Sequence, residues 1–239
     1  MTNLLTGTGD GPVFDAATVV LLRDTDAGPE CLMLRKTQGQ AFGGLWVFPG
    51  GKVETVDGTG LDGSRRAAVR EAQEETGLLL DPAELVPLAH WEPPPQAPRR
   101  YRTWFFVAAL PDGASEVVID GGEIGDQRWT APGAAIEAQA KGEIELLPPT
   151  WVSLHTLAGH TLAGHTDVAS TVAEVAQGPV VRYATRFVTD HGMMVSVWEP
   201  DVAYPEPPAV EVGPLDVPGP RNRLYMDPAG WRYETGDGD

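Results

Sequence analysis

Arg70-Glu71-Ala72-Gln73-Glu74-Glu75-Thr76-Gly77 is the stretch that decides the fold. On a helix, residues three and four apart share a face, so Glu71 lies beside both Glu74 and Glu75. Carboxylates crowded on one turn repel one another, and a bound cation relieves that repulsion. Hard divalent ions such as Mg²⁺ bind carboxylates together with substrate phosphates. The stretch therefore predicts a helix that carries a metal site or, alternatively, presents a solvated acidic face.

A glycine-rich turn precedes this helix. The apolar run Leu45-Trp46-Val47-Phe48 leads into Phe48-Pro49-Gly50-Gly51. Glycine permits close approach of the backbone, and proline fixes its own φ. After a linker, the pattern predicts a helix over 65–76 with Gly77 as its stop. A glycine-rich turn, a loop and an acidic helix form an arrangement that can hold a metal ion against a diphosphate.

Here the chain resembles the Nudix hydrolase family. The signature of that family is Gly, five residues, Glu, seven residues, and then Arg-Glu-apolar-x-Glu-Glu-x-Gly-apolar. The second half of the signature matches at every fixed position, which are Arg70, Glu71, Ala72, Glu74, Glu75, Gly77 and Leu78. The resemblance implies an α/β/α sandwich with a mixed sheet, and the irregular alternation of expected strands and helices favours the same class.

The first half of the signature departs from the family pattern. Asp62 keeps the spacing to the helix, but ten residues then separate Gly51 from Asp62, five more than usual. Asp57 keeps the spacing to Gly51 instead, with the extra residues after it. We favour Asp62 as the counterpart of the first glutamate. We also expect the segment between Gly51 and Asp62 to be a tolerated insertion, in which Asp57 has little influence.

The resemblance also implies a hydrolase that cleaves a diphosphate linkage with Mg²⁺ or Mn²⁺. The expected catalytic residues and metal ligands are the helix glutamates Glu71, Glu74 and Glu75, with Gly51 beside the metal. Arg70 is expected to orient a glutamate, and the backbone of Gly50 and Gly51 to contact substrate. The general base stays open between a glutamate of the helix and Glu123 in a later loop.

The longer loop is similar to that of a Nudix subgroup that includes peroxisomal coenzyme A diphosphatases. Looser similarities to this subgroup lie at 47–51, 102–106, 122–124, 128–129 and 146–150. They favour coenzyme A or an acyl-coenzyme A as substrate. Arg99, Arg100 and Arg102 are candidate substrate-binding residues, because a guanidinium suits phosphate contact. A solvated basic loop is the alternative.

Other functions of the same fold stay open. The alternative substrates are ADP-ribose, NADH, a dinucleotide polyphosphate and a modified nucleoside triphosphate. A module from a different class, which senses a nucleotide without cleaving it, is a further alternative. All glutamates of the signature helix are present, and this favours the enzyme.

Charge and composition narrow the range of partners. The 239-residue chain has 17 Lys and Arg residues against 34 Asp and Glu residues, a formal net charge of −17. This charge argues against general nucleic-acid binding, which needs basic patches. The N-terminus lacks a basic region followed by an apolar run, and no apolar stretch approaches the ~20 residues that span a bilayer. We therefore expect a cytoplasmic protein that does not bind membranes.

The chain is expected to have three parts. Residues 1–12 form a flexible tail, 13–148 the Nudix domain and 149–239 a C-terminal extension. In the Nudix domain we expect strands at 16–23, 30–36, 85–91 and 103–110, and a helix at 132–141.

The extension is expected to be helical in parts over 150–177 and then β-rich and Pro-rich. Strands are expected at 180–188 and 193–198, and seven prolines predict an irregular surface segment over 199–220. Asp227-Pro228-Ala229-Gly230 fits a type I turn that joins two short strands into a hairpin. Since a two-stranded ribbon is marginal alone, we expect it to pack on the core or on the partner subunit of a homodimer.

Overall fold

The computed structural model describes residues 11–39, 42–114, 116–119, 121–205 and 215–238. Contacts divide the chain into two compact units. Unit 1 comprises Met1–Phe14, Trp91–Arg102 and Arg182–Asp239, and unit 2 comprises Asp15–His90 and Thr103–Val181. Most of the expected tail at 1–12 lies outside the described residues. Unit 2 includes residues beyond 148, where we expected the extension to begin.

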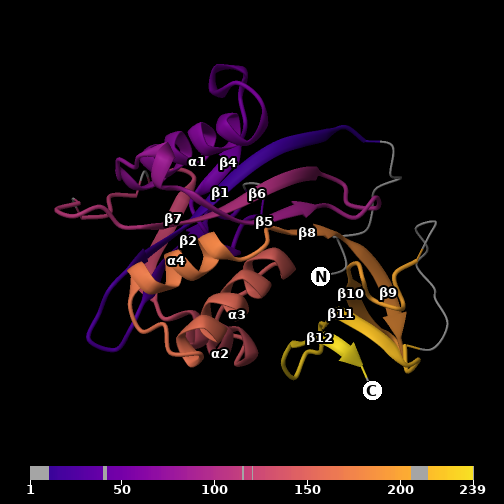
Figure 1. The fold of residues 1–239 in the computed structure, drawn as a ribbon. Coiled ribbons are helices and arrows are strands. Elements are labelled where there is room, and N and C mark those ends of the chain that lie inside the picture. The colour runs from indigo at the N-terminus through magenta and orange to yellow at the C-terminus, as the bar shows by residue number, and fades with distance from the viewer. Residues whose placement is uncertain (1–10, 40–41, 115, 120, 206–214, 239) are drawn as a thin grey trace. The chain divides into compact units, whose positions relative to one another are not determined.

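A mixed sheet forms the centre of unit 2 (Figure 1). Its strand order is β3-β2-β1-β6-β5, with β4 also paired to β1 and β7 to β2. The strands are β1 Val13–Arg23, β2 Glu30–Lys36, β3 Trp46–Val47, β4 Gly50–Lys52, β5 Val86–Glu92, β6 Arg100–Ala109 and β7 Ile124–Thr130. Strand β2 pairs antiparallel with β1, β3 and β7. The bounds of β2 agree with the expected strand at 30–36.

Helices cover both faces of this sheet (Figure 1). Helix α1 lies on one face, and α2, α3 and α4 lie on the other. Their bounds are α1 Gly60–Thr76, α2 Pro132–Ala140, α3 Pro148–Leu162 and α4 Val168–Gln177. Strand β1 is buried at every position from Ala16 to Leu22, as expected for a strand covered on both sides. The α/β/α sandwich expected from the sequence is confirmed.

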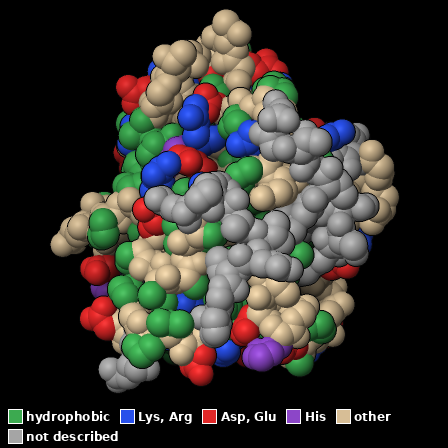
Figure 2. All heavy atoms as spheres, turned by 90° about the vertical axis from the view of Figure 1, so that its right-hand side faces the viewer, with side chains coloured by type: hydrophobic (Ala, Val, Ile, Leu, Met, Phe, Trp, Pro, Cys, Tyr) green, Lys and Arg blue, Asp and Glu red, His purple; other side chains and the backbone are tan. Residues whose placement is uncertain are grey.

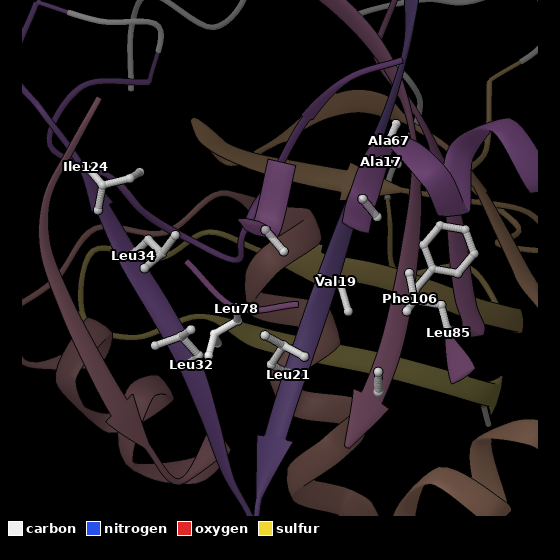
Figure 3. Close-up of a cluster of buried hydrophobic side chains, with 13 residues drawn as sticks. Ala17, Val19, Leu21, Leu32, Leu34, Ala67, Leu78, Leu85, Phe106 and Ile124 are labelled. Atoms are coloured by element: carbon white, nitrogen blue, oxygen red, sulfur yellow. The ribbon is translucent and has the colours of Figure 1, made fainter. Parts of the chain in front are cut away.

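The core between α1 and the sheet is built from small helix residues and branched strand residues. Ala67, Ala68 and Ala72 of α1 are all fully buried in this cluster. Figure 3 shows Leu21 and Leu32 of the sheet close to Leu78, which follows the helix. The small alanine side chains let the helix backbone lie close to the sheet. The helix is amphipathic, and most of its charged residues lie on the side away from this apolar stripe.

Helix α1 ends as expected but begins earlier. Gly77 adopts the left-handed conformation with φ of 72°, and its N–H donates to the carbonyl of Gln73 at 2.9 Å. The helix starts at Gly60, whereas the pattern predicted a start at Arg65. Gly60 and Gly63 have low helix propensity, which hides the first turn from a sequence pattern. Two short 3₁₀ turns flank the helix, η2 at Thr55–Asp57 and η3 at Pro82–Glu84.

Unit 1 contains a four-stranded antiparallel sheet in the order β12-β11-β10-β9. Its strands are β9 Arg186–Asp190, β10 Met193–Val197, β11 Gly219–Tyr225 and β12 Arg232–Gly238. The expected turn joins β11 to β12, with the N–H of Gly230 donating to the carbonyl of Asp227 at 3.0 Å. The hairpin is therefore no isolated ribbon, because β11 also pairs with β10.

Two buried groups stabilise unit 1. Arg223 and Asp201 are both fully buried, and two guanidinium nitrogens of Arg223 donate to Asp201 at 2.6 and 2.7 Å. Trp91 stacks on Tyr183, from β8 (Val181–Ala184), at a ring-centroid distance of 4.0 Å. The expected surface position of segment 199–220 is wrong for Asp201 and Leu215, which are buried. Residues 206–214 of that segment lie outside the described part of the chain.

Charge on the surface is mixed. On the face drawn in Figure 2, Lys and Arg side chains lie among Asp and Glu side chains. Across the residues that the structure describes, no helix has both the length and the apolar character to cross a membrane.

Candidate active site

The signature helix presents its glutamates at three different depths. The side chain of Glu75 is 4% exposed, that of Glu71 is 16% exposed and that of Glu74 is 60% exposed. The exposure differs because Ala68 and Ala72 form the side of α1 that packs on the core. Glu75 lies next to that side, whereas Glu74 faces away from it. The three carboxylates are therefore not equivalent in their surroundings.

Glu75 is held by groups from two other elements. Its Oε1 accepts a hydrogen bond from Lys36 Nζ at 2.6 Å, and its Oε2 accepts one from the N–H of Gly50 at 2.9 Å. Lys36 Nζ also donates to Glu123 Oε1 at 2.7 Å. Lys36 ends β2, Gly50 begins β4, and Glu123 directly precedes β7. Residues of β2 and β4 thus meet at one carboxylate of the helix, and Glu123 joins them through Lys36.

Burial and neighbouring charges together set the pKa values of this cluster. Burial raises the pKa of Glu75 to about 7, although the charge of Lys36 opposes the shift. Burial also raises the pKa of Glu71, against the opposing effect of Arg70, and the neighbouring charges of Glu74 and Glu123 add to the rise. For Lys36, burial disfavours the charged form, but Glu75 and Glu123 outweigh it and the pKa is raised. The carboxylates are thus close enough to affect one another's ionisation.

Gly50 and Gly51 lie so close to neighbouring groups that a side chain would not fit at either position. A Cβ on Gly51 would collide with the carboxylate of Glu71. A Cβ on Gly50 would collide with the backbone of Ala17 and Thr18, to which β4 pairs. Neither position can take a larger residue without movement of the site. Both glycines thus lie beside the signature helix, and their expected contacts with substrate and metal stay predictions.

Arg70 joins the helix to the preceding loop. Its Nε and Nη2 donate to the two carboxylate oxygens of Asp57 at 3.1 and 2.9 Å. Its Nη1 donates to Glu71 at 2.9 Å, with a longer contact of 3.4 Å to Glu74. Hydrogen bonds from Arg70 are the main cause that lowers the pKa of Asp57, and the same bonds raise the pKa of Arg70. Arg70 thus joins Glu71 to Asp57, and its expected role of orienting a glutamate stays a prediction.

Our preference for Asp62 as the counterpart of the first signature glutamate is wrong. Asp57 is 4% exposed and holds Arg70, whereas the Asp62 side chain is 78% exposed and pairs with Arg65 at 3.0 Å. The extra residues follow Asp57 and form the start of α1. Asp57 is therefore part of the structure that supports the site and is no member of a silent insertion. The correct signal was its spacing of five residues from Gly51.

The structure brings together most of the predicted site residues within unit 2. They are Gly50, Gly51, Arg70, Glu71, Glu74, Glu75 and Glu123. The candidate substrate-binding residues Arg99, Arg100 and Arg102 belong to unit 1. Sequence reasoning missed Lys36. Its signal was its place two residues beyond Leu34, on the inward side of a strand in which Arg35 is exposed.

The donor set fits a hard divalent cation in its chemistry. Carboxylate oxygens are the ligands that Mg²⁺ prefers, and Glu71 and Glu75 offer them beside the glycine turn. The absence of a side chain at Gly51 lets the carboxylate of Glu71 lie directly against the glycine turn. Among the described residues, no three His, Cys, Asp or Glu side chains form a ready-made metal cluster. Glu71 and Glu75 are therefore the pair around which a metal site would be built.

Comparison with known proteins establishes the family. A family model described as NUDIX domain matches residues 13–157. The chain belongs to the Nudix family. This Nudix protein is a hydrolase that acts on pyrophosphate bonds. No curated protein sequence matches it.

The chain is similar to several solved structures. A NUDIX hydrolase from Alicyclobacillus acidocaldarius has a TM-score of 0.61 and 21% identity, over 71% of this chain and 100% of that one. The Ap4A hydrolase of C. elegans has a TM-score of 0.47 and 19% identity, over 63% and 98%. The NUDIX domain of Shewanella oneidensis NrtR, solved with ADP ribose, has a TM-score of 0.48 and 14% identity, over 63% and 90%. The first of these matches supports the fold, and identities this low do not select a substrate.

Proposed function

We propose that this Nudix hydrolase uses Mg²⁺ or Mn²⁺ to cleave a diphosphate linkage in a nucleoside diphosphate derivative. The observation that carries this proposal is the placement of Glu71 and Glu75 on one face of α1, beside the Gly50–Gly51 turn. Each glutamate is fixed by a hydrogen bond from its surroundings, Glu71 by Arg70 and Glu75 by the N–H of Gly50. Carboxylates fixed in this way are suited to hold a metal ion against a phosphate.

Each residue of the site has a distinct part in this proposal. When bound, the metal neutralises charge on the phosphates and lowers the pKa of a water molecule. Glu71 and Glu75 would hold the metal, and exposed Glu74 would supply a further carboxylate. The N–H of Gly50 fixes one oxygen of Glu75, which keeps the carboxylate from rotating. Arg70, anchored by Asp57, keeps Glu71 in place.

The general base is proposed to be a carboxylate of the same cluster. Glu123 is one candidate, because its carboxylate is held 2.7 Å from Lys36 Nζ while its side chain remains 54% exposed. A glutamate of α1 is the other. Exposure favours Glu123 for contact with water, since a base must reach a proton of the nucleophile. Loss of kcat in Glu123→Gln with an unchanged KM would support Glu123 in this role.

The first experiment is a hydrolysis screen with and without Mg²⁺ or Mn²⁺. Substrates would be coenzyme A, acyl-coenzyme A, ADP-ribose, NADH, a diadenosine polyphosphate and an oxidised nucleoside triphosphate. We expect cleavage of at least one nucleoside diphosphate derivative, and no cleavage with EDTA. Turnover that persists in EDTA would contradict the metal requirement. Tight nucleotide binding without turnover of any substrate would indicate a sensing module instead.

Within this class, we propose coenzyme A or an acyl-coenzyme A as the substrate. The support is the similarity of the sequence to the coenzyme A diphosphatase subgroup and the basic cluster at Arg99, Arg100 and Arg102. If the cluster binds the 3′-phosphate, its replacement by Ala should raise KM for coenzyme A about tenfold. KM for dephospho-coenzyme A should change much less. Equal changes for the two substrates would remove the arginines from this role.

A cytoplasmic location and a homodimer remain predictions that accompany this function. The division of the chain into a Nudix domain at 13–148 and an extension at 149–239 also remains a prediction. Size-exclusion chromatography with light scattering would test the homodimer. A monomer at micromolar concentration would remove it.

A further inference from the structure

Lys36 is the cation most closely placed against the glutamate cluster. Its side chain is 8% exposed, compared with 23% for Arg70. Its ammonium nitrogen lies 2.6 Å from an oxygen of Glu75 and 2.7 Å from an oxygen of Glu123. One positive charge thus sits between a carboxylate proposed to bind the metal and a carboxylate proposed as the base. No position of the signature accounts for it.

The backbone fixes Lys36 in this place. The N–H of Lys36 donates to the carbonyl of Leu45 at 3.1 Å, and its carbonyl accepts from the N–H of Gly44 at 2.9 Å. The next residue, Thr37, donates its N–H to the carbonyl of Glu123 at 2.9 Å. A register shift between Arg35 and Lys36 in the pairing of β2 with β7 ends the strand at this point. Glu123 is therefore held by the backbone of Thr37 and by the side chain of Lys36.

We propose that Lys36 competes with the divalent cation for Glu75 and so lowers the affinity of the site for metal. This inference rests on the proposed function. The ammonium and a metal ion on the same carboxylate repel each other, and repulsion between charges is strong where water is largely excluded. A site with two negative carboxylates and no such lysine would hold the metal more tightly. In this account, Lys36 influences the metal only through its contact with Glu75.

The test is direct measurement of Mn²⁺ binding without substrate, by calorimetry or by the electron paramagnetic resonance signal of free Mn²⁺. Wild type, Lys36→Gln, Lys36→Arg and the control Lys141→Gln would be compared at pH 8.5, where carboxylates are ionised. Lys141 is a suitable control because its side chain is 63% exposed. It forms an ion pair with Glu137, four residues earlier in the chain, which is not part of the glutamate cluster.

The charge-removing variant should bind Mn²⁺ at least tenfold more tightly than wild type. Lys36→Arg keeps the charge and should stay within about twofold of wild type, as should Lys141→Gln. Equal or weaker binding by folded Lys36→Gln would overturn the inference, because a purely structural lysine would loosen the site when removed. Failure of wild type to bind Mn²⁺ at all would overturn the proposed metal site itself, which separates the two outcomes.

A second measurement follows the wild-type protein, and a variant serves only to assign one signal. The sequence contains three lysines, Lys36, Lys52 and Lys141, so a lysine ε-¹³C spectrum is simple. The signal missing from Lys36→Arg identifies Lys36. Titration with Mg²⁺ should shift the Lys36 signal and leave that of Lys141 unchanged. An unchanged Lys36 signal at saturating Mg²⁺ would overturn the competition.

Discussion

Arg70 holds Asp57 through both carboxylate oxygens, at 3.1 and 2.9 Å, across thirteen positions of the chain. The same guanidinium contacts Glu71, so the position of a proposed metal ligand depends on a residue in the preceding loop. Aspartate here takes the place that the family signature gives to glutamate. The shorter side chain still reaches Arg70, and Arg66 Nε of α1 also donates to the carbonyl of Asp57 at 2.7 Å.

Replacement of Asp57 by Ala should destabilise the protein by about 2–4 kcal/mol, because it leaves Arg70 without its main partner. Asp62→Ala should change stability by no more than ~0.5 kcal/mol, since an exposed ion pair contributes little. Urea unfolding of both variants checks this prediction. A larger loss in Asp62→Ala than in Asp57→Ala would restore our original alignment.

The contribution of Asp57 should also depend on pH. Arg70 holds the pKa of Asp57 below its usual value, so the stabilisation is present above the unfolded-state pKa of about 3.9. It is lost as pH falls through the lower folded-state value. The difference in unfolding free energy between wild type and Asp57→Asn should therefore be constant above about pH 5 and shrink below about pH 4. A difference that grows on acidification would contradict the assignment.

Gly51→Ala should reduce turnover while the protein remains folded. A Cβ at this position would collide with the carboxylate of Glu71 and push it from its place. Overpacking of this kind costs about 1–3 kcal/mol. Gly133→Ala is the matched control, because no heavy atom lies within 4 Å of a Cβ at Gly133. Full activity in Gly51→Ala would mean that Glu71 needs no fixed position.

The buried ion pair of unit 1 should contribute more than an exposed one in the same unit. Asp201→Ala leaves Arg223 uncompensated and should cost about 3–5 kcal/mol. Arg182→Ala breaks a pair with Glu92 in which the Arg182 side chain is 61% exposed, and should cost no more than ~1 kcal/mol. Urea unfolding followed by tryptophan fluorescence measures both. Similar losses for the two variants would contradict the role of burial.

Local signals in the sequence predicted a large part of unit 2. The end of α1 followed from Gly77, and β2 followed from its apolar run and flanking turn. The beginning of α1 was missed because Gly60 and Gly63 carry no helical signal of their own. In unit 1, the sequence predicted the hairpin but not the four-stranded sheet. The pairing of β10 with β11 joins residues far apart in the chain, and no local pattern reports it.

The residues of the candidate site also fall into two groups, those that local sequence spacing predicts and those that it does not. Residues on consecutive turns of α1 could be placed together from spacing alone. Lys36 could not, because its contact with Glu75 spans 39 positions and depends on how β2 lies against α1. Asp57 could have been found from its distance to Gly51, but the spacing to the helix pointed to Asp62. The spacing to the helix favoured Asp62, and the contact between Asp57 and Arg70 favours Asp57.

The most direct test of the central claim is kcat for Glu75→Gln at saturating Mg²⁺, on the best substrate of the screen. Glu143→Gln is the control, since Glu143 is exposed and lies outside the cluster. We predict that Glu75→Gln remains folded and loses about 10²–10³-fold in kcat, the loss typical for one group that stabilises charge in the transition state. Glu143→Gln should match wild type. A folded Glu75→Gln protein with wild-type kcat would contradict the assignment of this cluster as the active site.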